Sequence, residues 1–254
     1  MGKIIAVVNQ KGGVGKTTTA VNLTAALHDL GLKVLLCDFD PQANATSGLG
    51  LDKRKIKYSV YDVTINGVPA ADAVVHTKYG DVLPSTADLA GAAVELISTP
   101  GRERQLAQAL EKVKDQYDVI LVDCPPSLEL LTLNALCAAD SILVPVQCEY
   151  YALEGLSDLM STLRAVKRNL NPRLEIFGVV LTMFDGRTNF STQVAQEVRR
   201  HFPGKVFSEA IPRNIRLAEA PSHGIPVTAY DKSSRGSKAY KAIAEEMKAK
   251  LSNA

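Results

Sequence analysis

The chain has 254 residues, of which 46% are hydrophobic and 22% charged, and its formal net charge is only +2. This length supports one substantial core and no Pro/Gly/Ser-rich linker interrupts it, so we predict a single domain over residues 1–254. No apolar stretch approaches the ~20 residues of a membrane span, and because the sequence runs directly into the first strand we expect no signal peptide. We therefore expect a cytoplasmic protein without a membrane partner.

The first predicted element is a strand, because residues 4–8 form an apolar run. Apolar residues then recur at helical spacing from residue 19 to residue 30. A glycine-rich turn at residues 10–18 lies between them. Strand, glycine-rich turn and helix in this order are typical of a phosphate-binding loop.

The residues of this turn have the chemistry that a nucleotide needs. Three glycines allow backbone angles closed to other residues and can bring N–H groups close to phosphate oxygens: Gly12, Gly13 and Gly15. Lys16 adds a positive charge near the β and γ phosphates, and Thr17 offers its hydroxyl to Mg²⁺. Gln10 stands where the usual pattern has glycine. The sequence still predicts a nucleotide site.

Apolar strand-like runs alternate with helical patterns along the rest of the chain. We predict strands at 33–38, 81–83, 118–123, 141–146 and 176–182, and helices at about 86–97, 102–116, 127–139, 151–170, 190–202 and 237–251. Continuous aliphatic strands are buried on both faces, and helical crossovers make neighbouring strands parallel. The predicted fold is therefore α/β, a three-layer α/β/α sandwich with a mostly parallel central sheet and its ligand at the carboxyl ends of the strands.

Carboxylates end two of these strands. Asp123 is placed to hold Mg²⁺ through water, and the alternative is that it caps the next helix. Asp38 and Asp40 point the same way while the chain stays extended, so both can face the nucleotide. One can support the metal while the other orients water, and their spacing leaves open which does which. Pro125-Pro126 must form a turn, which can respond to the γ-phosphate.

The cysteines and the charges give weaker signals. The spacing of the four cysteines fits no metal or disulfide framework, so we expect buried thiols in a reducing compartment: Cys37, Cys124, Cys137 and Cys148. Residues 182–254 carry 12 Lys/Arg against 7 Asp/Glu, a net charge of +5, so the basic part of the chain is C-terminal. This asymmetry fits a solvated surface as well as a nucleic-acid interface.

Five segments together resemble the ParA/Soj family of chromosome and plasmid partitioning ATPases. They are KGGVGKTT at 11–18, DFDPQANATSGLG at 38–50, VDCPPS at 122–127, PVQCEYYALEG at 145–155 and IPRNIRLAEAPSHG at 211–224. Any single segment would place the chain only in the wider class of deviant Walker A P-loop NTPases, which also holds the MinD division regulators and the nitrogenase iron protein. The resemblance implies that the chain binds ATP with Mg²⁺ and hydrolyses ATP.

The resemblance also implies roles for individual residues. Lys11 is the signature lysine, which reaches the phosphates of ATP in a partner subunit. Lys16 holds its own nucleotide, and Asp40 positions or activates the attacking water. Thr17, Asp38 and Asp123 lie at the metal. The implied nucleotide-binding set is Lys11, Gly12, Gly13, Val14, Gly15, Lys16, Thr17, Thr18, Met183, Pro212 and Asn214, and Thr182 and Phe184 line the same pocket.

Further expectations concern partners. Arg187 and Arg216 match the DNA-contacting arginines of the family, and both lie in the basic C-terminal part. The family implies a homodimer in the ATP state, sequence-independent binding of double-stranded DNA and association with the nucleoid. It also implies stimulation of hydrolysis by a ParB/Spo0J-like centromere-binding protein.

Three alternatives remain open. A MinD-like, membrane-associated division-site regulator would need an amphipathic membrane helix at its end, but residues 237–251 are alanine-rich and predict a core-packing helix. An iron–sulfur ATPase would need cysteines on exposed loops, whereas Cys124 and Cys148 follow predicted strands. A metabolic enzyme of the same loop class, such as a biotin-pathway synthetase, would need a small organic substrate for turnover.

Overall fold

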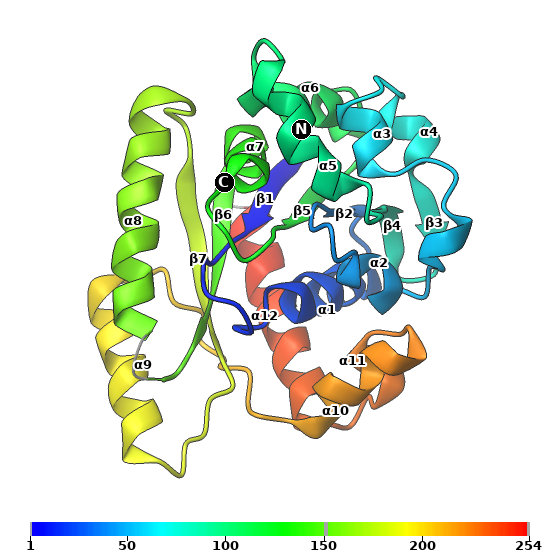
Figure 1. Cartoon of the computed structure of the whole chain (residues 1–254). Helices are drawn as coiled ribbons and strands as arrows, with labels where there is room; N and C mark the ends of the chain where they lie inside the picture. Colours follow the sequence, from blue (N-terminus) through cyan, green and yellow to red (C-terminus); the bar gives the residue numbers. More distant parts are fainter. Residues whose placement is uncertain (1, 150–151, 253–254) are drawn as a thin grey trace.

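The computed structural model of the chain describes residues 2–149 and 152–252, so Tyr150 and Tyr151 of the 145–155 segment lie outside the described residues. Within these ranges seven strands form one sheet in the order β3-β4-β2-β5-β1-β6-β7 (Figure 1). They are β1 Lys3–Val7, β2 Val34–Asp38, β3 Val75–Thr77, β4 Gly80–Leu83, β5 Val119–Asp123, β6 Ser141–Gln147 and β7 Glu175–Thr182. Every neighbouring pair is parallel except β3 with β4.

Helices cover both faces of this sheet (Figure 1). The α-helices are α1 Lys16–Asp29, α2 Asn44–Gly48, α3 Val60–Thr64, α4 Ala70–Ala73, α5 Leu89–Glu95, α6 Gln105–Glu111, α7 Leu130–Ala138, α8 Ala152–Asn169, α9 Asn189–His201, α10 Ile215–Glu219, α11 Val227–Tyr230 and α12 Arg235–Ser252. Short 3-10 turns are η1 Lys53–Lys55, η2 Leu96–Ser98, η3 Arg102–Arg104, η4 Lys114–Gln116 and η5 Ala220–His223. Among the described residues, no helix combines the length and the hydropathy that a membrane crossing requires.

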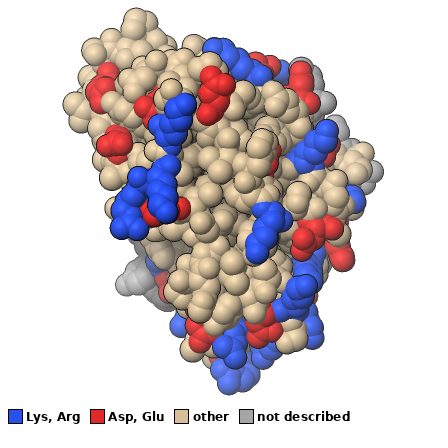
Figure 2. All heavy atoms as spheres, turned by 90° about the vertical axis from the view of Figure 1, so that its right-hand side faces the viewer, with Lys and Arg blue, Asp and Glu red and all other residues tan. Residues whose placement is uncertain are grey.

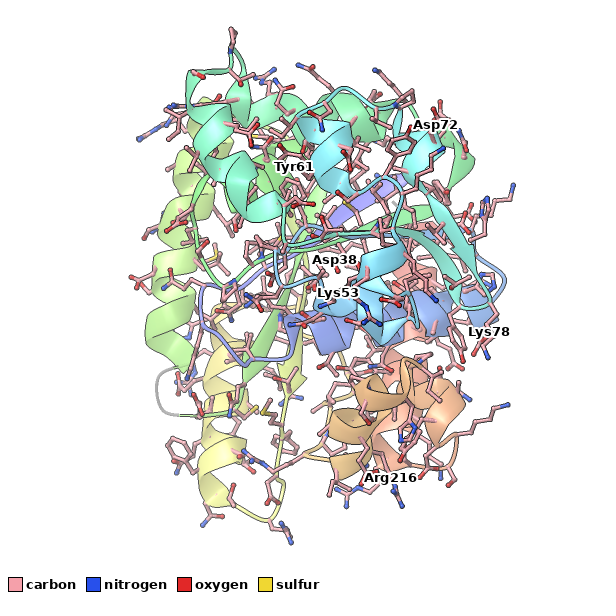
Figure 3. The ribbon with its side chains drawn as sticks, turned by 45° about the vertical axis from the view of Figure 1, so that its right-hand side comes forward. Asp38, Lys53, Tyr61, Asp72, Lys78 and Arg216 are labelled. Atoms are coloured by element: carbon pink, nitrogen blue, oxygen red, sulfur yellow. The ribbon has the colours of Figure 1, made fainter. Side chains whose placement is uncertain are left out.

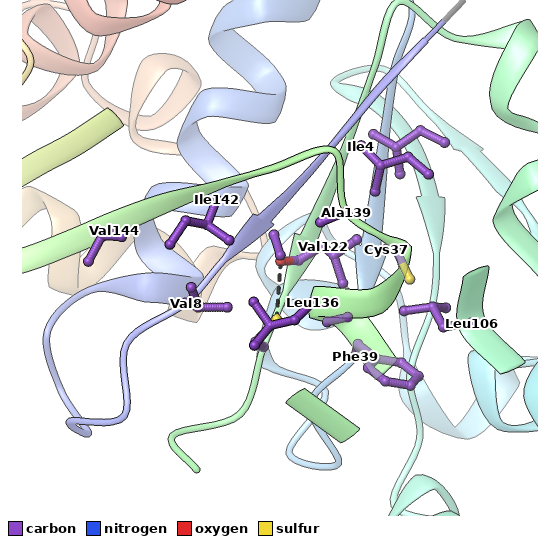
Figure 4. Packing of buried hydrophobic residues seen from close by; sticks show 14 of the residues in the cluster. Ile4, Val8, Cys37, Phe39, Leu106, Val122, Leu136, Ala139, Ile142 and Val144 are labelled. Atoms are coloured by element: carbon purple, nitrogen blue, oxygen red, sulfur yellow. Dashed lines mark hydrogen bonds between the residues drawn. The ribbon is translucent and has the colours of Figure 1, made fainter. Parts of the chain in front are cut away.

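Alternate residues of the strands enter two separate cores, as a sheet buried on both faces requires. Ile4 and Ala6 of β1 face one core, which the helices α3–α9 complete. Figure 4 shows part of this core, where Phe39 and Leu106 lie beside the sheet. Ile5 and Val7 face the other core, which α1 and α12 cover. The predicted α/β/α sandwich is confirmed.

The helix after the phosphate-binding loop packs against the last helix of the described chain. The hydroxyls of Thr19 in α1 and Tyr240 in α12 lie 3.2 Å apart, both fully buried. Lys248 Nζ of α12 donates to the carbonyl oxygen of Leu30 at the end of α1 at 2.7 Å. The prediction that residues 237–251 form a core-packing helix is confirmed, because Ile243, Ala244 and Met247 are also buried.

Three features differ from the sequence-based expectations. The antiparallel edge strand β3 was not predicted, and neither were the short helices α2, α3, α4, α10 and α11. Elements of three to five residues are too short to show a period. The prediction of four buried thiols is wrong for Cys137, which is only partly buried. Cys137 lies at helical spacing from Leu130 and Leu133, which are also only partly buried and lie at the margin of the core.

Candidate nucleotide site

The loop between β1 and α1 has the backbone of a phosphate-binding loop. Gly13 and Gly15 have φ angles of +75° and +89°, a region that favours glycine. Gly15 is the N-cap of α1, and the first turn of α1 has no acidic residue. The free N–H groups and the positive end of the helix dipole are therefore available to an anion. This geometry agrees with the glycine pattern in the sequence.

Two side chains that the sequence did not single out as anchors hold this loop. Asn9 donates from Nδ2 to the carbonyl oxygen of Pro145 at 2.8 Å and accepts the N–H of Lys11 at Oδ1 at 3.0 Å. Thr182 Oγ1 donates to the carbonyl oxygen of Val14 at 2.8 Å. The loop is thus fixed from the ends of β6 and β7, which is preorganisation for a ligand.

The two lysines of the loop have different surroundings. Lys16 is buried, its Nζ donates to the carbonyl oxygen of Lys11 at 3.1 Å, and burial lowers the pKa of its ammonium group, opposed by Asp123. The Lys11 ammonium forms an ion pair with Glu149, and both side chains are about one-third exposed. Gln10 Nε2 also donates to Asp158 Oδ2 of α8 at 3.1 Å. The side chain of Lys16 is thus enclosed by the loop, whereas the side chain of Lys11 points out of it.

Asp38 differs from Asp40 and Asp123 because both a backbone N–H and a hydroxyl group of the protein donate hydrogen bonds to one of its carboxylate oxygens. Its Oδ2 accepts both the N–H and the hydroxyl of Thr46 at 2.7 Å. Burial raises its pKa to about 6, while the hydrogen bonds from Thr46 lower it. Ser85 continues this network, since its N–H donates to Thr46 Oγ1 and its hydroxyl donates to the carbonyl oxygen of Asp40. Asp38 therefore fixes α2 and the segment that carries Asp40 (Figure 3).

Asp123 has the opposite environment. The register of β2 and β5 places it directly beside Asp38, and it is fully buried. Within the described residues, neither of its carboxylate oxygens has a hydrogen-bond partner of normal geometry. Burial and then the charge of Asp38 raise its pKa well above the ordinary value, while Thr17 and Lys16 lower it. A buried polar group without a partner is rare, and hydrated Mg²⁺ beside Thr17 would satisfy it. The residues therefore fit a magnesium site.

The predicted adenine segment lies beside the end of β7. Phe184 donates its N–H to the carbonyl oxygen of Ile211 at 3.0 Å and forms a bridge with Pro212. Met183 has a φ angle of +51°, uncommon for a residue other than glycine and typical of functional sites. Asn214 Oδ1 accepts the N–H of Arg216 and caps α10. The structure thus brings Met183 and Pro212 together, and the amide nitrogen of Asn214 makes no hydrogen bond within the described residues.

The two predicted DNA-contacting arginines lie on the surface in local ion pairs. Arg187 is 89% exposed and donates from Nε and Nη2 to both oxygens of Asp185. Arg216 is 47% exposed, and its Nη1 donates to Glu219 Oε2 at 2.7 Å (Figure 3). Figure 2 shows the face on the right-hand side of Figure 1, where Lys and Arg lie in separate groups between acidic residues. Exposed pairs of this kind are weak because water screens both charges, so a phosphate can replace the carboxylate.

Comparison with known proteins adds to this geometry. A family described as an AAA domain matches residues 2–176. The chain is 55% identical over 251 residues to the sporulation initiation inhibitor protein Soj of Bacillus subtilis, covering 98% of this chain and 99% of that protein. It is 51% identical over 249 residues to the chromosome partitioning protein ParA of Caulobacter vibrioides, covering 96% and 93%. The chain belongs to the ParA/Soj family.

A solved structure gives the same fold as this ParA/Soj chain. It is described as cobyrinic acid a,c-diamide synthase from Mycobacterium smegmatis with bound ADP and magnesium, and it matches with a TM-score of 0.84 at 39% identity, covering 96% of this chain and 93% of that one. The resemblance drawn from five sequence segments is therefore confirmed over nearly the whole chain. Membership of this family shows that the chain is a P-loop ATPase related to chromosome-partitioning proteins.

Proposed function

We propose that this ParA/Soj chain is a DNA-partitioning ATPase whose cycle passes through a face-to-face homodimer. Each subunit binds ATP with Mg²⁺, two such subunits pair, and the pair binds double-stranded DNA without regard to sequence. A ParB-like protein stimulates hydrolysis, and the subunits separate on the nucleoid. The observation that carries the proposal is the buried Asp123 beside the fixed glycine loop and Lys16, because its carboxylate has no hydrogen bond of normal geometry within the described residues. The second lysine of the loop, Lys11, forms an ion pair with Glu149 at the surface.

The residues divide the work of hydrolysis between them. Lys16 and the amides of the loop hold the phosphates, and Thr18 contributes to the same cradle. Bound magnesium would be held by Thr17 and, through water, by Asp123, with Asp38 adding charge nearby, and it would screen charge on the phosphates. Asp40 Oδ1 accepts the N–H of Gln42 at 2.9 Å, which leaves Oδ2 to orient water.

The role of Asp40 gives a first prediction. Replacing Asp40 with alanine should lower ATP turnover ~100-fold or more, because the group that orients water is removed. The residues that hold the phosphates are unchanged, so the ATP dimer should persist. Sedimentation velocity with ATP, with and without non-specific DNA, measures both dimer and DNA binding. Asp72→Ala, an exposed change on α4, is the control, and rapid loss of the Asp40→Ala dimer with ATP present would contradict the role.

DNA binding would use phosphate contacts, because no base-reading element was recognised in the sequence. Arg187 and Arg216 each keep guanidinium donors beyond those used in their ion pairs. Pairing of two subunits would double the number of arginines and couple ATP binding to DNA affinity through multivalency. Binding should therefore weaken steeply as salt increases.

A double substitution tests these arginines. Arg187→Ala with Arg216→Ala should weaken binding of a 30-base-pair duplex ~10-fold or more and reduce the slope of log affinity against log salt. The control is Arg54→Ala with Arg102→Ala, since Arg54 is also 89% exposed and donates to both oxygens of its aspartate, Asp52. Fluorescence anisotropy at two salt concentrations measures both pairs. If the two double variants bind DNA equally well and with the same salt dependence, Arg187 and Arg216 do not contact DNA.

The alternatives have less support. A membrane-bound, MinD-like role would need an exposed apolar helix, whereas the apolar residues of α12 are buried against α1. Flotation with liposomes tests it directly. A metabolic role like that in the description of the Mycobacterium smegmatis structure would require a small organic substrate for turnover. The lower identity to that protein, 39% against 55% for Soj, favours partitioning.

A further inference from the structure

A groove crosses the edge of the sheet opposite the nucleotide site. It begins at the amino ends of β1, β6 and β7, where two adjoining hollows of about 560 and 340 Å³ share Glu175, Ile176 and Lys205. The larger hollow extends to Lys250 and Leu251 of α12, and the smaller one extends along α8. Since the nucleotide loop lies at the carboxyl ends of the same parallel strands, a ligand in the groove and ATP would not compete.

The rim of the groove is basic. Six cations line it, Lys3, Arg164, Lys167, Arg173, Lys205 and Lys250, against two carboxylates, Asp140 and Glu175. Asp140 already accepts the N–H of Ile4 and pairs with Lys114. In the described part of the chain, four of the cations have no ion pair or side-chain hydrogen bond: Lys3, Lys167, Arg173 and Lys205. The groove therefore presents positive charge that the protein does not neutralise.

The floor of the groove is apolar, and one wall is the edge of a strand. The floor is formed by Met160, Leu163, Leu174, Ile176, Phe177 and Leu251. On its outer side β7 is first paired at Val179, which bridges Val206, and no described strand or bridge covers that edge before it. An open strand edge offers backbone groups to an extended peptide.

We propose that this groove is a docking site for an acidic, partly apolar peptide segment of a partner protein, bound in extended form beside the start of β7. Alternate side chains of an extended segment point to opposite faces, so its apolar residues would cover the floor while its acidic residues meet the rim. A DNA backbone would contact the basic rim but leave the apolar floor and the strand edge uncovered, which favours a peptide over nucleic acid. The proposal goes beyond the partitioning cycle and requires neither ATP nor DNA.

The test uses the full chain without nucleotide and a fluorescein-labelled ten-residue peptide in which Glu alternates with Val or Leu. Anisotropy should show saturable binding, and a peptide with Lys in place of Glu should not bind. Arg173→Glu with Lys205→Glu, both exposed, should weaken binding at least 10-fold while ATP turnover is kept. The control is Lys55→Glu with Lys57→Glu, which places the same charge change on exposed residues far from the groove lining.

Three outcomes would overturn the proposal. The first is absence of saturable peptide binding, and the second is equal loss of affinity in the groove and control variants. The third is a groove variant that keeps the peptide but loses binding to a 30-base-pair duplex or to phosphatidylglycerol vesicles, which would assign the surface to nucleic acid or lipid. Failure of the partitioning cycle would leave the peptide titrations unchanged, because they contain neither ATP nor DNA.

Discussion

Replacing Lys11 with alanine should abolish ATP-dependent dimerisation and lower turnover ~100-fold or more, yet leave nucleotide affinity within about threefold of the wild type. The reason is the division between the two lysines. Lys16 is buried in its own loop, whereas Lys11 extends to Glu149 at the surface of the loop and can turn to a facing subunit. Sedimentation velocity, a turnover assay and titration with a fluorescent ATP analogue measure the three quantities.

Two controls make this result specific. Gln10→Ala removes the neighbouring contact with Asp158 but keeps the lysine, so its dimer should form normally. Lys16→Ala should instead lose nucleotide binding itself. A Lys11→Ala protein that hydrolyses ATP at the normal rate would contradict a role across the interface.

Substitution of Asp123 should give the second large effect, which is a loss of ATP turnover together with a gain in the stability of the nucleotide-free protein. Asp123→Asn should lower turnover ~100-fold or more, because the carboxylate proposed to hold the metal through water is lost. The same change should stabilise the nucleotide-free protein by about 1–3 kcal/mol, since it removes a buried carboxylate that lies beside Asp38 and that has no hydrogen bond of normal geometry within the described residues. Urea unfolding without nucleotide measures the stability.

The control for Asp123 is Asp72→Asn, an exposed aspartate of α4, which should change stability by less than about 0.5 kcal/mol. Saturating ATP and Mg²⁺ should stabilise the wild type more than Asp123→Asn, because only the wild type has the carboxylate for the metal. Unchanged or lower stability of nucleotide-free Asp123→Asn would show that the carboxyl has a partner in solution, and would count against the metal role.

The sequence predicted the parts of this protein that depend on local patterns. Six of the seven strands among the described residues follow from aliphatic runs, and the glycine loop follows from its spacing. The different roles of Asp38 and Asp123 could not be predicted, because both are aspartates at the ends of buried strands. The two residues differ because Thr46 donates hydrogen bonds to Asp38 and not to Asp123. Thr46 lies eight residues after Asp38, in a helix too short to show a period.

Contacts between residues far apart in the chain could not be predicted from the sequence either. Thr182 lies 168 residues from Val14, whose carbonyl oxygen it binds, and Asn9 lies 136 residues from Pro145. No pattern in a single sequence encodes such pairs, although Asn9, Pro145 and Thr182 stand at or near the ends of strands that the sequence predicted. The ion pair of Lys11 with Glu149 was missed for the same reason.

The contact between α1 and α12 has a consequence for how the protein is made. The helix that carries the phosphate-binding loop buries Thr19 and Leu23 in a core that Tyr240, Ile243 and Met247 complete. A ribosome synthesises α1 well before α12, so the nascent chain has the complete loop sequence long before that core exists. A growing chain should therefore be unable to retain nucleotide until α12 has emerged, which would keep unfinished subunits out of the dimer.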